Sequence, residues 1–303
     1  MPCSFQISSF SALQLPDGKN PRMDFLDSSF FKADGSGRSL PTPSEIQALS
    51  GKDWGRPQPP PVRFEELGLL VKFGPYVTTA EAQCLWAIRR VLGDKVPVPE
   101  VYGWRIDGGR VFIYMQLVRG ETLADRWKTL GTTDRSAVCD QLRRMIASLR
   151  QVQQDPEDQF IGSIDRGHLL DKVFEGEPPG GPFTSVKHFN DWFSRLPWLR
   201  FPNPEKIQDP WREFLPDVGT IKLTHGDLHR GNVIVSSEDP PRVLAIVDWA
   251  HCGWYPDYWE YCKAAYTCAY NGEWRNKWIP KILTPRPEVH EIFAEYTRAL
   301  GAV

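Results

Sequence analysis

The chain has 303 residues, of which 41% are hydrophobic and 24% are charged, and its formal net charge at pH 7 is -2. This length can bury a core of one large or two medium domains, and the charge provides no basic footprint for nucleic acid. The N-terminus lacks a secretory signal, no apolar run could span a bilayer, and the six cysteines match no familiar zinc spacing. We therefore expect a soluble, cytoplasmic protein with reduced thiols that binds neither nucleic acid nor membrane, and we leave its oligomeric state open.

The first 61 residues form the least regular part of the chain, because Ser, Gly and Pro recur and apolar residues show little periodicity. The segment from Ser44 to Leu49 predicts one short helix, with Pro43 near its start. We leave residues 1–61 as an irregular N-terminal segment. The alternative is that they belong to the domain that follows.

Residues 67–92 predict a strand followed by a helix. The segment 67–73 reads LGLLVKF, which is apolar except for Lys72 and therefore predicts a strand. A helix then begins at Thr78 and keeps its apolar residues on one side. The spacing from Thr78 to Glu81 is that of a capping box, in which the glutamate satisfies a free backbone N–H of the first turn.

Residues 96–118 predict extended structure. Two prolines exclude a helix from the segment 96–102. An Asp-Gly pair predicts a turn over 105–109, and the apolar run VFIYMQLV at 111–118 predicts the next strand. We therefore expect a small β-rich region that ends near Val118.

The remainder of the chain is predicted to be mainly helical. Apolar residues recur at helical spacing over 134–152, and this pattern predicts the clearest helix of the chain. Gly, Pro and Asp are frequent over 155–182, which predicts a loop excursion. Further helices are predicted over 184–193, 257–270 and 288–300, with Pro256 near the start of the second of these.

One stretch, from Ile221 to Trp249, carries the residues with the clearest chemistry. It reads IKLTHGDLHRGNVIVSSEDPPRVLAIVDW and predicts three short strands, over 221–223, 233–235 and 243–247. Asp227 and Asn232 lie on the tight loop between the first two strands, and Asp248 ends the third. Two carboxylates and one amide are therefore expected at neighbouring strand ends.

The spacing Asp-x4-Asn, followed by an aspartate after a hairpin, is the arrangement that kinases use for phosphoryl transfer. In this arrangement Asp227 accepts the proton of the substrate hydroxyl or holds that hydroxyl in line. Asn232 and Asp248 hold the Mg²⁺ that bridges the phosphates of ATP, since magnesium prefers hard oxygen ligands and keeps several waters. The alternative is a chance His-Gly-Asp turn, but the loop, the hairpin and the terminal aspartate together favour the kinase arrangement.

The motif HGDLHRGN at 225–232, followed by IVDW at 246–249, resembles the H-x-D-x4-N…D motif of the aminoglycoside phosphotransferase/choline kinase-like family. The resemblance implies an α+β, bilobal, protein-kinase-like fold with a small β-rich N-lobe and a mainly helical C-lobe. It assigns residues 62–118 to the N-lobe, and residues 119–303 to a C-lobe that holds the catalytic loop and the acceptor pocket. It also implies an ATP- and Mg²⁺-dependent phosphotransferase that acts on a hydroxyl of a small molecule.

Three departures from a protein kinase favour a small-molecule acceptor. Gly226 stands where a protein kinase usually has an arginine, and Trp249-Ala250 replaces Phe-Gly after the metal aspartate. No Ala-Pro-Glu follows, and Pro256 comes too soon after Asp248 to leave room for an activation segment. Ala250 is in addition a departure from the family, since many relatives carry an acidic residue at this position, and we leave the contribution of that site open.

The resemblance also implies where ATP binds. Lys72 would contact the α- and β-phosphates, the alternative being an ordinary exposed lysine near a strand end. Glu81 would pair with Lys72, and the helix cap described above is the other interpretation. Gln116, Leu117 and Val118 would meet adenine at the hinge between the lobes, although the same residues also suit a plain core strand.

The N-lobe of a kinase needs a glycine loop over the phosphates, and no G-x-G-x-x-G occurs in this chain. Ser50 to Gly55 (SGKDWG) is the only glycine-bearing candidate. The missing motif keeps a second hypothesis open, namely a catalytically degenerate kinase-like protein that binds a nucleotide or a partner without turnover. The complete set of Asp227, Asn232 and Asp248 opposes it.

Nine aromatic residues crowd the segment 254–278. Some fit one helical face and predict core packing, whereas Tyr255, Tyr258, Tyr261 and Trp274 do not fit that face. Aromatic rings attract cations, and acids such as Glu260 lie among them, so one hypothesis is that these residues line the cleft for a cationic acceptor. The alternative is that they pack the C-lobe.

Overall fold

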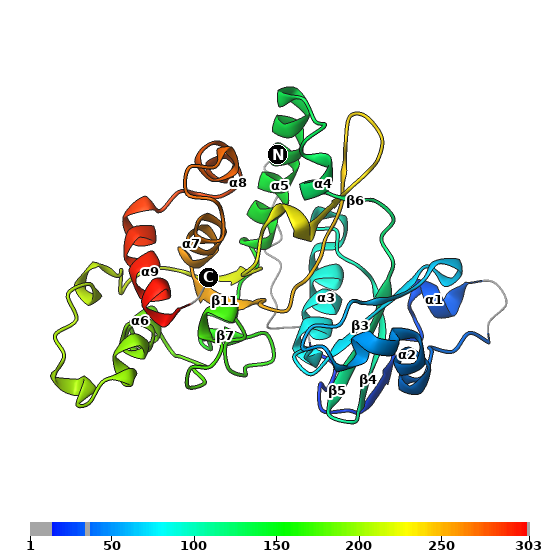
Figure 1. Cartoon of the computed structure of the whole chain (residues 1–303), viewed down its shortest axis with the longest axis horizontal. Coiled ribbons are helices and arrows are strands. Elements are labelled where there is room, and N and C mark those ends of the chain that lie inside the picture. Colours follow the sequence, from blue (N-terminus) through cyan, green and yellow to red (C-terminus); the bar gives the residue numbers. More distant parts are fainter. Residues whose placement is uncertain (1–13, 34–36, 302–303) are drawn as a thin grey trace.

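The structure is a computed structural model that describes residues 14–33 and 37–301. Figure 1 shows two lobes, of which the smaller, at the lower right, is built on an antiparallel sheet of five strands. The order of its strands is β1-β4-β5-β3-β2. Their bounds are β1 Arg22–Asp24, β2 Val62–Phe64, β3 Leu69–Gly74, β4 Val101–Asp107 and β5 Arg110–Gln116.

Alternation along the strands gives this sheet two different faces. Helix α3 (Thr79–Leu92) covers one face, where its Leu85 and Ile88 share a core with Ile113 of β5. Lys72 lies between Val71 and Phe73, which point to the opposite face. The period of β3 therefore turns the lysine toward α3.

The other face of the sheet is covered by the N-terminal segment. Helices α1 (Ser29–Lys32) and α2 (Pro43–Ser50) contribute Phe30 and Ile46 to a core on this face. A capping box starts α2, since Thr42 and Glu45 exchange hydrogen bonds. β1 pairs with β4 at the sheet edge, where a Cβ on Gly103 would lie 2.2 Å from the Met23 carbonyl oxygen.

The larger lobe is mainly helical and carries two small sheets (Figure 1). Its helices are α4 Leu123–Arg126, α5 Thr132–Leu149, α6 Val186–Arg195, α7 Trp259–Tyr266, α8 Ile279–Ile282 and α9 Pro287–Leu300. One sheet has the order β10-β9-β6, with bounds Val243–Ile246, Val233–Val235 and Glu121–Thr122. The other has the order β7-β11-β8, with bounds Gly162–Ser163, Gly253–Pro256 and Ile221–Thr224. This architecture confirms the predicted bilobal α+β fold.

The lobes meet in a shared core. Cys84 on α3 and Cys252, which precedes β11, are buried free thiols whose sulfur atoms lie 2.7 Å apart. The Ile246 N–H of β10 also donates to the carbonyl oxygen of Pro97, at 2.9 Å. Helix α3 and the strand that leads to Asp248 are therefore both tied across the lobe boundary.

The structure corrects two boundaries. The predicted helix over 257–270 is shorter, since α7 spans only Trp259–Tyr266. Pro256, predicted near the start of that helix, is the last residue of strand β11, which pairs with β8. The predicted turn over 105–109 is confined to Gly108 and Gly109, both with positive φ, because β4 continues to Asp107 and pairs there with Arg110. Within the described ranges, the structure has no helix long and apolar enough to cross a membrane.

Candidate active site

The loop between β8 and β9 presents Asp227, and its backbone requires Gly226. The φ of Gly226 is +79°, and a Cβ there would lie 2.9 Å from the carbonyl oxygen of His251. The residue that distinguishes this loop from that of a protein kinase is therefore needed for the close approach of two backbone segments.

His225 sets the spacing between Asp227 and the strand that ends at Asp248. Its Nδ1 accepts the Asp227 N–H at 3.1 Å, so its proton lies on Nε2, which donates to the Val247 carbonyl oxygen at 3.1 Å. The ring is fully buried, and burial lowers the pKa of His225 to about 4. His225 is therefore a neutral link between the two acidic positions.

Glu260 of α7 holds the backbone of the same loop by hydrogen bonds. Its carboxylate accepts the backbone N–H groups of His225 and Gly226, at 2.6 and 3.2 Å, and its side chain is buried. Sequence reasoning placed Glu260 among acids facing a cationic acceptor, and this is wrong. Glu260 lies outside the motif 225–232 that it holds, so the motif alone gave no signal for its role.

Asp227 has one oxygen engaged and one open. Asn232 Nδ2 donates to Asp227 Oδ2 at 3.1 Å and to its carbonyl oxygen at 2.9 Å, and His229 Nε2 lies 3.6 Å from Oδ2. Burial opposes ionisation, but the contact with His229 outweighs it and the pKa of Asp227 is lowered. Among the described residues Oδ1 has no protein partner, so it can accept a hydrogen bond from a hydroxyl group.

The neutral His229 ring is oriented to donate a hydrogen bond toward Asp227. The Gly231 N–H donates to His229 Nδ1 at 2.9 Å, so the ring proton lies on Nε2, on the side of the Asp227 carboxylate. Asn232 and His229 together hold one carboxylate oxygen and leave the other for a ligand.

Lys72 joins the two lobes at the site. Its ammonium lies 2.8 Å from Glu81 and 2.6 Å from Asp248 Oδ1, and these two carboxylates raise the pKa of Lys72 even though burial lowers it. Thr78 makes no side-chain cap, so Glu81 pairs with the lysine instead of closing a capping box. Sequence reasoning left this choice open.

Asp248 has a backbone conformation that is unusual for an aspartate. Its φ is +61°, in the left-handed region, and its side chain is 45% exposed. Asn232 donates its amide hydrogens to Asp227, and its Oδ1 has no partner among the described residues. Asp248 Oδ2 has none there either, since Lys72 binds Oδ1. Two hard oxygen atoms are therefore free, which suits a magnesium ion that completes its shell with phosphate and water.

The hinge residues lie where β5 ends, and they differ in which hydrogen-bonding groups are free for a ligand. Gln116 accepts the Glu100 N–H with its side chain, and the buried Leu117 donates its N–H to the Gly68 carbonyl oxygen at 2.9 Å. The Val118 N–H makes no hydrogen bond to any described residue. Of these backbone N–H groups, Val118 is the one open to a ligand.

The glycine-bearing stretch 50–55 is not a phosphate loop. It forms a short 3₁₀-helix, Gly51–Gly55, whose Trp54 stacks on Phe73 and Phe112 with centroid distances of 5.5 and 6.0 Å. That face of the sheet is opposite to Lys72. The chain then enters β2 through RPQPPP, and a Cβ on Gly74 at the end of β3 would lie 3.1 Å from the Cδ of Pro59.

The proposed aromatic lining of the acceptor cleft is also wrong for its main members. Tyr255 and Tyr258 are 0% and 1% exposed, and the Tyr258 hydroxyl donates to Asn190 Oδ1 at 2.6 Å. Trp274 is buried against Trp127, and the Arg230 guanidinium lies over both rings at 5.3 Å. A cation of the chain itself therefore occupies the aromatic faces that a ligand would need.

The chain is similar to a known protein family and to several solved structures. Residues 65–281 match the family described as phosphotransferase enzyme family (APH), whereas no curated protein matches the chain. The solved structure of aminoglycoside phosphotransferase APH(4)-Ia is similar over 77% of this chain and 76% of its own, with 15% identity and a TM-score of 0.47. That of aminoglycoside phosphotransferase APH(3'')-Id from Streptomyces rimosus is similar over 85% and 96%, with 15% identity and a TM-score of 0.46.

Proposed function

Because this chain belongs to the phosphotransferase enzyme family, we propose that it transfers a phosphoryl group from ATP to a hydroxyl of a small molecule. The family membership agrees with the resemblance carried by HGDLHRGN and IVDW. The observation that carries the proposal is the arrangement around Asp227, which has an open carboxylate oxygen beside Asn232. The buried His225 connects its backbone to that of Val247, the residue before Asp248, and Asp248 pairs with Lys72.

In the proposed reaction Asp227 Oδ1 accepts the hydrogen bond of the acceptor hydroxyl and takes its proton as the hydroxyl oxygen attacks the γ-phosphorus of ATP. The bond between that phosphorus and the bridging oxygen breaks, and ADP leaves with its electron pair. Asn232 and His229 keep the carboxylate in one orientation, so the hydroxyl is held in line. Lys72, held by Glu81, would place its positive charge next to the negative phosphates of ATP. Asp248 must leave Lys72 when phosphates enter between them.

The residues fit a metal and a nucleotide. Asn232 Oδ1 and Asp248 Oδ2 would hold Mg²⁺, which when bound neutralises charge on the phosphates. Val118 would donate its free N–H to adenine, and Leu117 would contribute apolar surface at the hinge.

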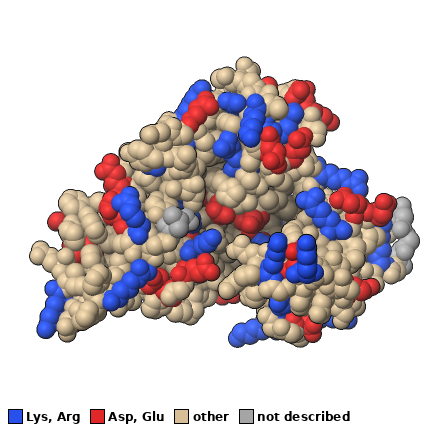
Figure 2. All heavy atoms as spheres, viewed as in Figure 1, with Lys and Arg blue, Asp and Glu red and all other residues tan. Residues whose placement is uncertain are grey.

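Acidic groups favour a cationic acceptor. Figure 2 shows acidic side chains in the hollow between the lobes, and the site itself holds three carboxylates, those of Glu81, Asp227 and Asp248. Such a field attracts amines and repels acids. The preference rests on these carboxylates, since the aromatic residues first considered for it are buried.

A second candidate function is nucleotide binding without turnover. The proline-rich entry to β2, RPQPPP, supports it, because a kinase covers the phosphates there with a flexible glycine loop. In that case ATP would bind and no acceptor would be phosphorylated.

The test is to incubate the chain with ATP, Mg²⁺ and a library of hydroxylated metabolites, including amino alcohols and their uncharged isosteres, and to measure products by mass spectrometry. We expect one phosphoryl group to be added to an amine-bearing alcohol, and far slower addition with Asp227→Asn. Nucleotide binding is measured in parallel by calorimetry. Binding of ATP without any product would favour the second function, and absence of both would overturn the proposal.

A further inference from the structure

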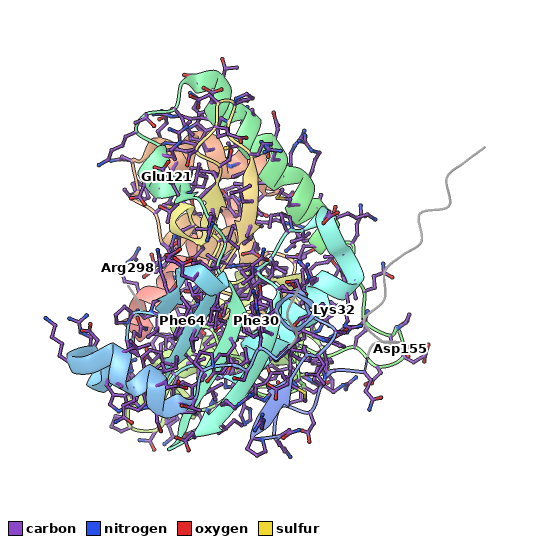
Figure 3. All side chains as sticks on the ribbon, turned by 90° about the vertical axis from the view of Figure 1, so that its right-hand side faces the viewer. Phe30, Lys32, Phe64, Glu121, Asp155 and Arg298 are labelled. Atoms are coloured by element: carbon purple, nitrogen blue, oxygen red, sulfur yellow. The ribbon has the colours of Figure 1, made fainter. Side chains whose placement is uncertain are left out.

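Two thiols face each other across the boundary between the lobes. Cys84 lies on α3 of the small lobe, Cys252 lies between Asp248 and β11 of the large lobe, and their sulfur atoms are 2.7 Å apart. Figure 3 shows the lobes one above the other, with Glu121 labelled in the large lobe and Phe64 in the small lobe. Among the described cysteines, no other two sulfur atoms are in contact.

The distance between these two sulfur atoms suits a reversible disulfide. At 2.7 Å they are within about 0.7 Å of the distance at which two sulfur atoms are bonded. Both cysteines are free thiols in this structure, so the bond would be a second state of the same chain. The two positions are 168 residues apart, and the bond would therefore join segments that are distant in sequence.

The thiol pair is attached to both partners of Lys72. Cys84 follows Glu81 by three residues, so the two side chains lie on the same side of α3. Cys252 follows Asp248 by four residues, on the segment that leads into β11. A covalent bond between the sulfur atoms would therefore fix α3, and with it Glu81, relative to the segment that carries Asp248.

The thiols are protected while the lobes are closed. Cys84 is 0% and Cys252 is 3% exposed, and burial raises the pKa of Cys84 well above its usual range, so its thiol stays protonated. Because the two thiols belong to different lobes, a motion that separates the lobes also separates the sulfur atoms and exposes them to water. Hydrogen peroxide is barely larger than water, so a small opening is enough to admit it.

We propose that Cys84 and Cys252 form a redox switch that locks α3 to the large lobe when the chain meets a peroxide. In the open state one thiolate attacks an oxygen of hydrogen peroxide, the O–O bond breaks, and a sulfenic acid and water form. On closure the second sulfur attacks the sulfenic sulfur, the S–O bond breaks, and a disulfide and another water form. The thiols lose two hydrogen atoms in total, and the peroxide is reduced to water. A dithiol reductant reverses the bond by exchange.

The lock has a consequence for turnover, and this part alone rests on the proposed function. A nucleotide enters and leaves between the lobes, so a link between α3 and the large lobe should slow its exchange. Glu81 remains on Lys72 in the linked state, so the site stays assembled while exchange is blocked. We expect the oxidised chain to turn over at least about tenfold more slowly, since opening limits product release, and a reductant should restore the rate.

The test treats the full chain with hydrogen peroxide under native conditions, removes the excess with catalase, blocks free thiols and maps the peptides by mass without a reductant. We expect a loss of two hydrogen atoms per chain, and the peptide that holds residue 84 joined to the peptide that holds residue 252. The midpoint of thermal unfolding should rise by at least about 5 °C, because the bond closes a long loop. Dithiothreitol should reverse both changes. A link that forms only in denaturant, or a link without a higher midpoint, would contradict the switch.

Matched variants assign the effect to this pair. Cys84→Ala and Cys252→Ala each keep one thiol of the pair, so peroxide should cause neither the mass loss nor the higher midpoint. Cys268→Ala is the control and should behave like the wild type, because the Cys268 thiol donates to the Ala264 carbonyl oxygen and contacts neither thiol of the pair. A higher midpoint after oxidation of either single-thiol variant would place the bond elsewhere and overturn the proposal. Mass and unfolding measurements need no phosphoryl transfer, so they stay readable if the proposed function fails.

Discussion

The catalytic loop and the segment that precedes β2 are fixed in opposite ways. In the loop, Asp227 is positioned by hydrogen bonds from Asn232 and through His225, and Glu260 holds the backbone. Residues 50–61 are fixed by the Trp54 stack and by prolines, and they lie where a phosphate-covering loop is expected. The hydrogen bonds that position Asp227 are therefore all present, whereas a proline-rich segment stands where a kinase has its glycine loop. Single polar substitutions should be severe in the first region and mild in the second.

The largest effect is expected from Asp227→Asn. The amide cannot take the proton of the acceptor hydroxyl, so turnover should fall by about 10² to 10⁴, while ATP binding measured by calorimetry stays the same. Asp94→Asn is the matched control, since Asp94 is exposed. Turnover close to that of the wild type in Asp227→Asn would remove the catalytic assignment.

Asp248→Ala should abolish the part of nucleotide binding that depends on Mg²⁺, because the free Oδ2 is lost. Calorimetry with ATP in the presence and absence of Mg²⁺ measures this difference. The variant also frees Lys72 from one partner, so binding of ATP without the metal should not weaken. Wild-type affinity for Mg·ATP would mean that Asp248 holds no metal.

The third effect is on stability against pH. The pKa of His225 is lowered from 6.5 to about 4, so the unfolded chain binds a proton in this window that the folded chain does not. Stability should therefore be fully present above pH 6.5 and fall by about 3 kcal/mol as the pH drops to 4. Urea unfolding of the wild type and of His225→Gln measures it, and the variant should lose less stability over that window. Equal slopes would show that His225 is not held neutral.

Trp54→Ala probes the other region. Loss of the stack on Phe73 and Phe112 should cost about 2 kcal/mol of unfolding free energy, with turnover within about twofold of the wild type. Trp54→Phe keeps a ring there and should recover most of the stability. A large loss of turnover with normal stability would instead place this segment in catalysis.

The last prediction is that removal of phosphate groups from the protein leaves its turnover unchanged. Gly226 replaces the arginine that grips an activation-loop phosphate, and β11 begins at Gly253, five residues after Asp248. Phosphatase treatment of the purified chain should leave its rate unchanged. A marked loss of rate would reveal a regulatory phosphate elsewhere.

Local patterns in the sequence predicted the motif and the strands around it, because Asp227, Asn232 and Asp248 lie in one contiguous stretch that flanks the β9–β10 hairpin. The partner of Glu81 stayed open, since a capping box and an ion pair use the same spacing. Glu260 was misassigned and Tyr255 and Tyr258 were placed in the cleft, because they do not fit the helical face of the other aromatic residues, whereas Tyr255 lies on strand β11 and both rings are buried. Which face of an element is buried depends on contacts distant in sequence, such as that of Tyr258 with Asn190.

The shared Lys72 has a consequence for how a nucleotide arrives. Among the described residues it is the only lysine or arginine in ion-pair contact with Glu81, Asp227 or Asp248, and His225 adds no charge near neutral pH. Under the proposed function, this excess of carboxylates would repel free ATP, which is itself a polyanion. A nucleotide already paired with a divalent cation carries less negative charge and would bring the positive charge that Asp248 needs once it parts from Lys72. We therefore expect nucleotide and metal to enter the cleft together as one complex.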